Sequence, residues 1–309
     1  MKKRILFIGG TLRGFKLLEM LVNSGEKPIY AYIMKEDKHE TAKVSAALRK
    51  FCRIHNITSK VCKKINIDEA RNILKLRPDV AFVCGWRTII ASALYNKIPL
   101  GCMAAHDSLL PKYRGFAPLN WAIINGEEKT GVTLFRISRG VDSGEIFGQK
   151  IIKIGPRDTA TEVYPRIIDA TTELYREFLM ALEENKLKLH KQNESGATYT
   201  CKRTPADGEI NWNRPATKIY NFIRALSPPY PCAWTRYKGK ITRIAKASLP
   251  RKQLKYAGNI PGRIISILDG GVLILCGAGQ IVVNNIVTSQ NKHFSADKIF
   301  SSITITLGR

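Results

Sequence analysis

The N-terminal part of the chain alternates short apolar runs with longer amphipathic segments. The apolar runs have the length of buried strands and cover residues 4–9, 28–34 and 79–84. The amphipathic segments place apolar side chains at helical spacing and cover residues 11–24, 41–55 and 67–76. Gly9 and Gly10 turn the chain out of the first strand, and we expect Thr11 to cap the helix that follows. This order predicts an α/β fold with helices on both faces of a parallel sheet.

Polar and glycine-rich stretches follow several of these strands. In a parallel sheet, ligands bind at the carboxyl ends of the strands. The stretches after Gly9, Cys84 and Met103 are therefore the places where we expect a binding site.

The pattern changes toward the C-terminus. Residues 130–153 contain two strand-like runs, residues 159–185 form a long amphipathic helix, and the polar residues 186–203 are the expected linker. Beyond them, short β-rich runs are separated by glycine and proline, which predicts a small barrel-like domain. We therefore expect two domains, residues 1–200 and residues 201–309.

Charge is the unusual feature of the composition. Fifty Lys and Arg against 25 Asp and Glu give a formal net charge of +25. Residues 201–309 contribute 17 basic and 4 acidic side chains, so they are the most basic part per residue. Such an excess suggests an anionic partner such as a nucleic acid, an anionic lipid or a phosphorylated small molecule, although a solvated lysine-rich surface is an equal alternative.

Targeting signals and cysteine motifs do not stand out. The apolar run after Met1 is too short for a signal peptide, and no run approaches a transmembrane length, so we expect a cytoplasmic protein without a membrane partner. The cysteines are far apart and include no CxxC pair, which indicates free thiols and no metal site.

The most informative segment runs from Gly101 to Ile146. His106 lies at the end of a predicted strand, where a Pro- and Gly-rich loop begins. Asp142 lies on a second loop, between two predicted strands. A histidine with a carboxylate that can orient it is a general-base arrangement, although a lone histidine is more often structural.

This segment resembles the signature of formyltransferases that use 10-formyltetrahydrofolate. The resemblance rests on Ser-Leu-Leu-Pro-x-Tyr-Arg-Gly at 108–115, with His106 before it and Asp-x-Gly at 142–144 after it. It continues at 207–212, 223–225 and 230–234 and so covers nearly the whole chain. It implies a Rossmann-like domain followed by a smaller β-rich, OB-like domain, and 10-formyltetrahydrofolate as the formyl donor without a metal.

The resemblance also implies a catalytic trio of Asn, His and Asp, in which the Asn stands two residues before the His. His106 and Asp142 match this trio, but the Asn position is occupied by Ala104. An alanine offers no donor to the oxyanion that develops when the amine attacks the formyl carbon. Losing one such donor typically costs about 10²–10³ in rate, so we expect an impaired enzyme that still binds its ligands.

Two interpretations of Ala104 stay open. It is either a substitution made on purpose to trap substrates, or a natural residue in a pseudoenzyme or in an enzyme with a rearranged mechanism. We favour the first because the surrounding motif is intact. The natural pseudoenzyme would be a folate- or nucleotide-binding protein without catalysis.

The formyl acceptor depends on local features. Methionyl-tRNA formyltransferases carry Gly-Thr-Pro after the first strand and a long basic loop after the second. Here these positions read Gly-Gly-Thr-Leu-Arg at 9–13 and the short, mixed-sign segment 35–41. The chain looks more like sugar N-formyltransferases, so we expect a nucleotide-linked amino sugar as acceptor, with tRNA as the alternative that the basic C-terminal domain favours. Sugar enzymes of this kind are often homodimers.

The resemblance places the folate donor on two loops and suggests acceptor contacts. The residues expected to hold the folate are Trp86, Arg87, Thr88, Ile89, Ser138, Arg139, Gly140, Val141 and Asp142. The residues expected to contact the acceptor are Arg13, Lys202 and Arg203, toward a diphosphate, and Tyr230, which would stack on a base or sugar. Trp86 and Arg87 could instead serve packing, and Tyr230 could belong to a rigid turn.

Overall fold

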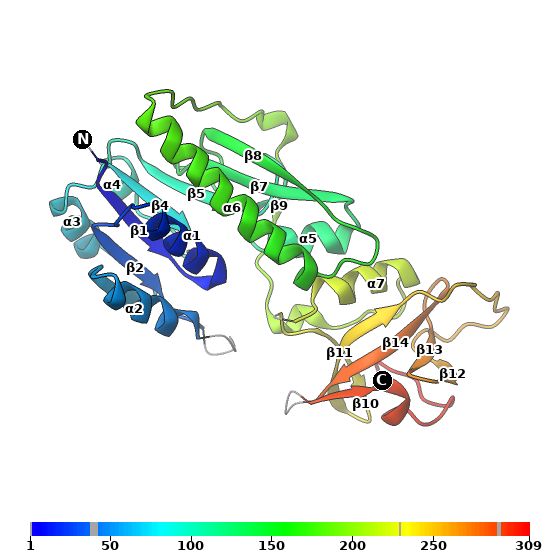
Figure 1. Cartoon of the computed structure of the whole chain (residues 1–309). Coiled ribbons are helices and arrows are strands. Elements are labelled where there is room, and N and C mark those ends of the chain that lie inside the picture. Colours follow the sequence, from blue (N-terminus) through cyan, green and yellow to red (C-terminus); the bar gives the residue numbers. More distant parts are fainter. Residues whose placement is uncertain (1, 38–42, 229, 289–291) are drawn as a thin grey trace. The chain divides into compact units, whose positions relative to one another are not determined.

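The computed structural model describes residues 2–309 except 38–42, 229 and 289–291. The chain divides into two compact units (Figure 1). The N-terminal unit consists of Met1–Gly115, Gly131–Ile152 and Pro165–Thr200, and the C-terminal unit of Phe116–Thr130, Lys153–Tyr164 and Cys201–Arg309. The C-terminal unit therefore also includes two segments that precede residue 200.

A seven-stranded sheet forms the centre of the N-terminal unit, in the order β3-β2-β1-β4-β5-β7-β8. Its strands are β1 (Ile5–Gly9), β2 (Tyr30–Met34), β3 (Ser59–Cys62), β4 (Val80–Cys84), β5 (Cys102–His106), β7 (Lys129–Arg136) and β8 (Ile146–Lys153). The first five strands in this order pair in parallel, whereas β7 runs antiparallel to β5. The predicted parallel sheet is therefore correct for its first five strands, and the whole sheet is mixed.

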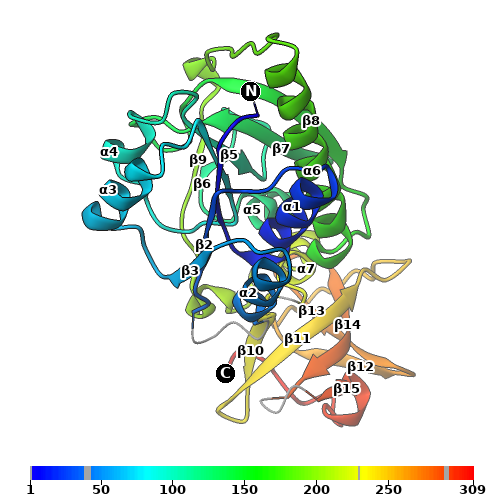
Figure 2. The same cartoon turned by 60° about the vertical axis from the view of Figure 1, so that its left-hand side comes forward.

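Helices cover both faces of this sheet, as Figure 2 shows. They are α1 (Thr11–Asn23), α2 (Val44–Ile54), α3 (Ile67–Lys75), α4 (Ser92–Tyr95) and α6 (Ala160–Glu183). Side chains alternate between the faces of a strand, so Val83 packs with α3 and α4 while its neighbour Phe82 contacts Tyr175 and Phe178 of α6. The central strands β1 and β4 are buried on both faces, and this explains their uninterrupted apolar sequence.

The turn between β1 and α1 differs from the prediction. Gly10 is the N-cap residue, and Thr11 is the first helical residue, with its hydroxyl bonded to no partner. Gly10 N–H donates to the Cys84 carbonyl at 3.0 Å, and a Cβ on Gly10 would lie 2.5 Å from Met34 Cβ. This close approach ties the start of α1 to the carboxyl end of β4, where a larger residue would not fit.

The C-terminal unit contains an antiparallel sheet in the order β10-β11-β14-β13-β12, with β15 beside β14. The strands are β10 (Ala233–Tyr237), β11 (Lys240–Ser248), β12 (Ile264–Leu268), β13 (Gly271–Leu275), β14 (Gln280–Val287) and β15 (His293–Ser295). Among the described residues no pairing joins β10 to β12, so the sheet stays open where a barrel was expected. Its helices are α5 (Pro118–Asn125) and α7 (Ala216–Ala225), with short 3-10 turns at Pro205–Gly208 (η2) and Ala296–Lys298 (η3).

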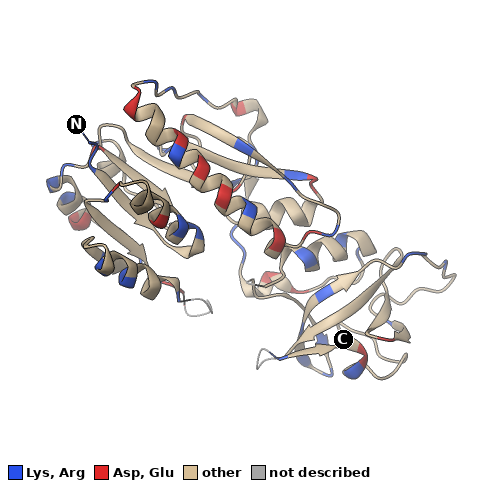
Figure 3. Cartoon of the chain, viewed as in Figure 1, with Lys and Arg blue, Asp and Glu red and all other residues tan. Residues whose placement is uncertain are grey.

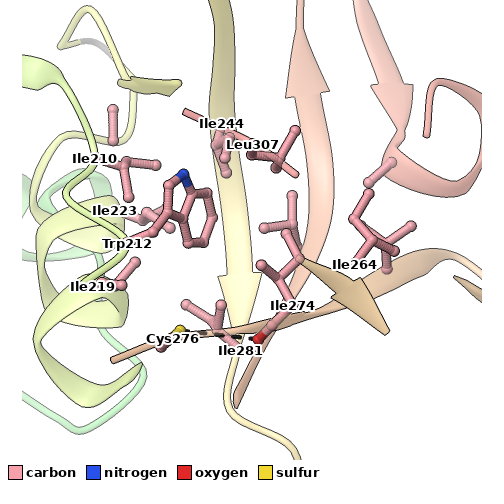
Figure 4. Packing of buried hydrophobic residues seen from close by; sticks show 14 of the residues in the cluster. Ile210, Trp212, Ile219, Ile223, Ile244, Ile264, Ile274, Cys276, Ile281 and Leu307 are labelled. Carbon is pink, nitrogen blue, oxygen red and sulfur yellow. Dashed lines mark hydrogen bonds between the residues drawn. The ribbon is translucent and has the colours of Figure 1, made fainter. Parts of the chain in front are cut away.

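Isoleucines dominate the core of this second unit. Ile219 and Ile223 of α7 face the sheet, and Trp212 packs beside them (Figure 4). The Trp212 indole N–H donates to Thr235 Oγ1 at 2.9 Å, so the buried indole is fully satisfied. The unit therefore has a hydrophobic core of its own. The fold class, an α/β domain followed by a β-rich one, is confirmed.

The polar segment 186–203 is more ordered than the linker that its composition suggested. It contains a 3-10 turn, η1 (Glu194–Gly196), and the strand β9 (Tyr199–Thr200). β9 pairs in parallel with β6 (Arg114–Gly115), inside the signature motif. Thr198 and Gln192 of this segment form hydrogen bonds with other parts of the N-terminal unit, and composition alone could not reveal them.

We also searched the described residues for helices long and apolar enough to cross a membrane, and found none.

Candidate functional site

The site is built around His106, the last residue of β5. Asp142 lies on the loop between β7 and β8, and its Oδ2 is 3.5 Å from His106 Nδ1. The Gly115 backbone N–H donates to the same carboxylate oxygen at 2.8 Å, which holds it toward the imidazole. Asp142 has a φ of 47°, a left-handed conformation that strains a non-glycine residue. His106 and Asp142, which the sequence singled out, thus lie side by side, and Gly115 from a third segment holds the carboxylate in place.

The hydrogen bonding of His106 identifies its tautomer. Nε2 is 2.8 Å from the Tyr113 carbonyl oxygen, and because a carbonyl can only accept, Nε2 carries the hydrogen. In the neutral ring, Nδ1 therefore keeps a lone pair that faces Asp142. Burial lowers the pKa of His106, and this outweighs the raising effect of Asp142 and of the Tyr113 carbonyl; Arg13 lowers the pKa further. With a lowered pKa the ring is neutral at neutral pH, and Nδ1 is the atom that can accept a proton during a reaction.

Ala104 lies on the same strand and the same face as His106. It pairs with Val83 of β4 and Phe135 of β7, and it is 9% exposed within an apolar cluster. The side-chain period of two in a strand explains why a residue two positions before the histidine faces the same site. At this position the chain presents a methyl group and no hydrogen-bond donor.

The first predicted folate loop follows β4. Trp86 is half-buried against the same apolar cluster as Ala104, and its indole Nε1 is buried without a hydrogen-bond partner. Arg87 donates to the Lys35 carbonyl at 3.2 Å, and Thr88 donates to the Lys63 carbonyl at 3.5 Å. Ile89 is 92% exposed, an unusual position for a large apolar side chain.

The second predicted folate loop contains Asp142 itself. Ser138 Oγ is 3.2 Å from Ser143 Oγ, which closes the base of the loop. The intervening residues Arg139, Gly140 and Val141 are exposed. The tip of this loop therefore faces solvent, next to the Asp142 carboxylate, which a hydrogen bond from Gly115 holds in place.

Arg13, expected to contact a phosphate, is instead buried in the N-terminal unit. Its guanidinium forms an ion pair with Asp107, the residue after His106. It also lies near the Cys84 thiol and opposes the raising of the pKa of that group by burial. The structure thus gives Arg13 an internal partner.

The other predicted acceptor residues belong to the C-terminal unit. Lys202 is exposed, whereas Arg203 is stacked between the rings of Trp121 and Phe222, at 5.0 and 5.3 Å from their centroids. Arg203 also donates to the Asp207 carbonyl. Tyr230 is half-buried, and its N–H donates to the Ser227 carbonyl at 3.1 Å, as in a turn. These contacts give Arg203 a packing role within its own unit.

Two further residues reach the site without having been predicted. Arg114 is fully buried and donates to Gln192, whose own amide donates to the backbone of the Asp142 loop. Arg114 belongs to the signature motif, but Gln192 lies in a polar segment with no recognisable spacing. Only its position in space reveals it.

No cluster of His, Cys, Asp and Glu suited to a metal ion occurs in the part of the chain that the structure describes.

Comparison with known proteins gives matches along the whole chain. The formyl transferase family model matches residues 3–179, and the formyl transferase C-terminal domain matches residues 202–304. The methionyl-tRNA formyltransferase of Acetivibrio thermocellus is 30% identical over 300 residues, which make up 96% of this chain and 95% of that protein.

Solved structures share the fold at lower identity. An N-formyltransferase from Helicobacter canadensis, in complex with folinic acid and dTDP-3-aminofucose, has a TM-score of 0.70 at 21% identity, over 92% of this chain and 99% of that one. A variant of HypX from Aquifex aeolicus has a TM-score of 0.65 at 18% identity, over 97% of this chain and 47% of that one. The chain thus spans about half the length of HypX.

Proposed function

This chain belongs to the formyl transferase family, and we propose that it moves the formyl group of 10-formyltetrahydrofolate to the amino group of methionyl-tRNA. The family, predicted from the sequence, is confirmed. The folinic acid bound to the similar Helicobacter canadensis enzyme supports the predicted folate donor. The observation that supports methionyl-tRNA as the acceptor is the 30% identity to a methionyl-tRNA formyltransferase over nearly the full length of both chains.

The residues of the first loop suit the folate donor. Trp86 Nε1 can only donate, and although it is buried it has no acceptor among the residues that the structure describes. Buried donors without a partner are rare in folded proteins, and a pterin ring carries carbonyl and ring-nitrogen acceptors. Trp86 with its loop would therefore hold the folate, which when bound supplies the formyl group for transfer.

His106 is the general base in this proposal. Its Nδ1 lone pair takes the proton that the acceptor amine loses as it attacks the formyl carbon, and the ring becomes an imidazolium. When the bond between the formyl carbon and folate N10 breaks, this proton would pass to N10, so that tetrahydrofolate leaves and His106 is neutral again. Asp142 then stabilises the new charge on the Nδ1 side, and the Tyr113 carbonyl keeps its bond to Nε2–H. Ala104 contributes no donor, so the chain stabilises the developing oxyanion less than a chain with Asn at this position.

A basic surface in the C-terminal unit supports an RNA acceptor. Trp234 of β10 pairs in register with Arg243 of β11, and the Arg236 guanidinium lies 5.7 Å from the centre of the Trp234 ring. Residues 201–309 carry 17 basic and 4 acidic side chains, and Figure 3 shows Lys and Arg spread over these strands. Basic side chains interleaved with aromatic rings are typical of surfaces that bind nucleic acid.

A nucleotide-linked amino sugar is the second candidate acceptor. The observation that favours it is the short segment of mixed charge at residues 35–41, where a long basic loop would serve tRNA. Residues 38–42 lie outside the described part of the chain, so this argument rests on sequence. The two candidates differ in size and in phosphate number.

Formyl transfer to a panel of acceptors distinguishes them. We expect transfer to methionyl-tRNA and none to dTDP- or UDP-linked amino sugars, and we expect Ala104→Asn to raise turnover by about 10²–10³ through the added amide donor. Ala104→Ser, which adds less volume and only a hydroxyl, is the matched control. Transfer to a sugar alone would replace the tRNA proposal, and no transfer by either variant or by the unaltered chain would indicate a non-catalytic binding protein.

A further inference from the structure

Gln192 uses both ends of its amide, and each end has a different partner. Its Oε1 accepts from Arg114 Nη2 at 2.7 Å and from Nε at 3.2 Å. Its Nε2 donates to the Asp142 carbonyl at 2.8 Å and to the Gly144 carbonyl at 2.7 Å. Because a guanidinium can only donate, Arg114 fixes which end of the amide faces the loop.

Arg114 is itself held firmly. It is 0% exposed, and besides Gln192 it donates to both Glu194 oxygens, at 2.8 and 2.7 Å, and to the Tyr199 hydroxyl at 3.1 Å. A buried guanidinium whose donors are satisfied in this way has little freedom to turn, since leaving any donor unpaired is costly. Gln192 is therefore seated on a rigid support.

The same segment also holds the histidine side of the site. Tyr113 N–H donates to Thr198 Oγ1 at 2.8 Å, and Arg114 N–H donates to the Thr198 carbonyl at 2.8 Å. The Tyr113 carbonyl in turn accepts from His106. Segment 192–200 thus contacts the backbone on both sides of the pair formed by His106 and Asp142.

We infer that Gln192 is a positioning residue that sets the distance between His106 and Asp142. The inference rests on the proposed role of these two residues in formyl transfer. Asp142 has a strained left-handed backbone, and two hydrogen bonds from one amide across residues 142 and 144 restrain the turn around it. Without them the loop can relax and carry the carboxylate away from Nδ1.

Two substitutions test this role. Gln192→Glu keeps the shape and the contact with Arg114 but sets a carboxylate oxygen against two carbonyl oxygens, and Gln192→Ala removes the amide. We expect kcat to fall by about 10- to 100-fold with both, because a misplacement of about 1 Å can cost that much. The KM for the acceptor should stay within about threefold, since the contacts of Gln192 are to Arg114 and to the backbone of the Asp142 loop, and not to a predicted acceptor residue.

A second readout does not need turnover. The negative charge of Asp142 raises the pKa of His106, while burial and Arg13 lower it. If the Asp142 carboxylate moves away, the pKa of His106 should fall further, and histidine NMR titration of the unliganded full chain measures this in Gln192→Ala. An unchanged His106 pKa together with an unchanged kcat would overturn the inference.

A matched control separates positioning from stability. Gln280 is a buried glutamine whose amide also holds a loop, donating to the Leu254 carbonyl at 2.7 Å in the C-terminal unit. Gln280→Ala should lower Tm without changing kcat or the His106 pKa. If the unaltered chain transfers no formyl group, the proposed function fails, yet the NMR titration still tests Gln192. Equal effects of the Gln192→Ala and Gln280→Ala variants would leave Gln192 with a structural role only.

Discussion

At the scale of single residues, the site depends on which atom of His106 is free. The Tyr113 carbonyl occupies Nε2, so the free lone pair of the neutral ring is on Nδ1 and faces Asp142. The carboxylate does not hold the neutral ring, but it stabilises the ring once Nδ1 is protonated. This arrangement suits a group that accepts a proton during the reaction and passes it on.

The pH dependence of turnover should report this histidine. The pKa of His106 lies below its ordinary value of 6.5, mainly because of burial, and only the neutral ring can accept a proton. Turnover should therefore be constant near neutral pH and fall as the pH drops through this lowered pKa, below 6.5.

Replacing His106 tests its role directly. His106→Ala should abolish turnover with little change in folate affinity, which isothermal titration can measure. Turnover like that of the unaltered chain would remove His106 from the mechanism.

At the scale of elements, loops carry the chemistry and strands fix where the loops begin. β5 ends at His106, β4 leads into the Trp86 loop, and β7 and β8 present the Asp142 loop between them. The antiparallel pairing of β5 with β7 sets Arg136, the last residue of β7, opposite Met103, so the Asp142 loop starts beside the first residues of β5 and runs back toward His106. The segment that contains Gln192 then connects the Asp142 loop with the residues Tyr113 and Arg114 that follow β5.

Gly144 offers a test of the Asp142 loop. A Cβ at this position would lie 1.6 Å from the Arg136 carbonyl oxygen, so any side chain must displace backbone. Gly144→Ala should lower the stability and reduce kcat by roughly 10²-fold through displacement of Asp142. Kinetics and thermal unfolding measure the two effects. Gly258→Ala, where a Cβ meets nothing within 4 Å, is the control and should change neither. Full activity of Gly144→Ala would mean that the loop tolerates displacement.

At the scale of the whole molecule, the excess of basic residues is densest in the last part of the chain, residues 201–309. The C-terminal segment 201–309 has few acidic residues, so its basic side chains are mostly not balanced within it. A small-molecule acceptor with two phosphates needs only a few of them. An acceptor with many phosphates, such as tRNA, would contact many more of these basic side chains, so the charge of this segment bears on which acceptor the protein binds.

Salt dependence of acceptor binding should therefore be steep. If about six phosphates are contacted, affinity for methionyl-tRNA should fall by about 10³-fold between about 50 and 200 mM salt. Replacing Arg243 or Lys246 with Gln should each reduce the slope of log affinity against log salt by about 1. Glu183→Gln, on α6 in the N-terminal unit, is the control and should leave the slope unchanged. A shallow slope, with about tenfold loss over the same range, would favour a diphosphate acceptor.

The sequence alone determined the first strands and helices of the N-terminal unit, the family, and the pair of His106 and Asp142, because these follow from periodic apolar positions and from a specific local motif. It did not indicate β3, α5 or α7. It did not reveal Gln192, the internal pairing of Arg13, or the packing of Arg203 between two rings, since each depends on residues distant in the chain. It also gave no sign that the polar segment 186–203 is ordered. Polar composition indicates that a segment stays out of the core, but only the tertiary structure decides whether its hydrogen bonds go to water or to another part of the chain, here the Asp142 loop.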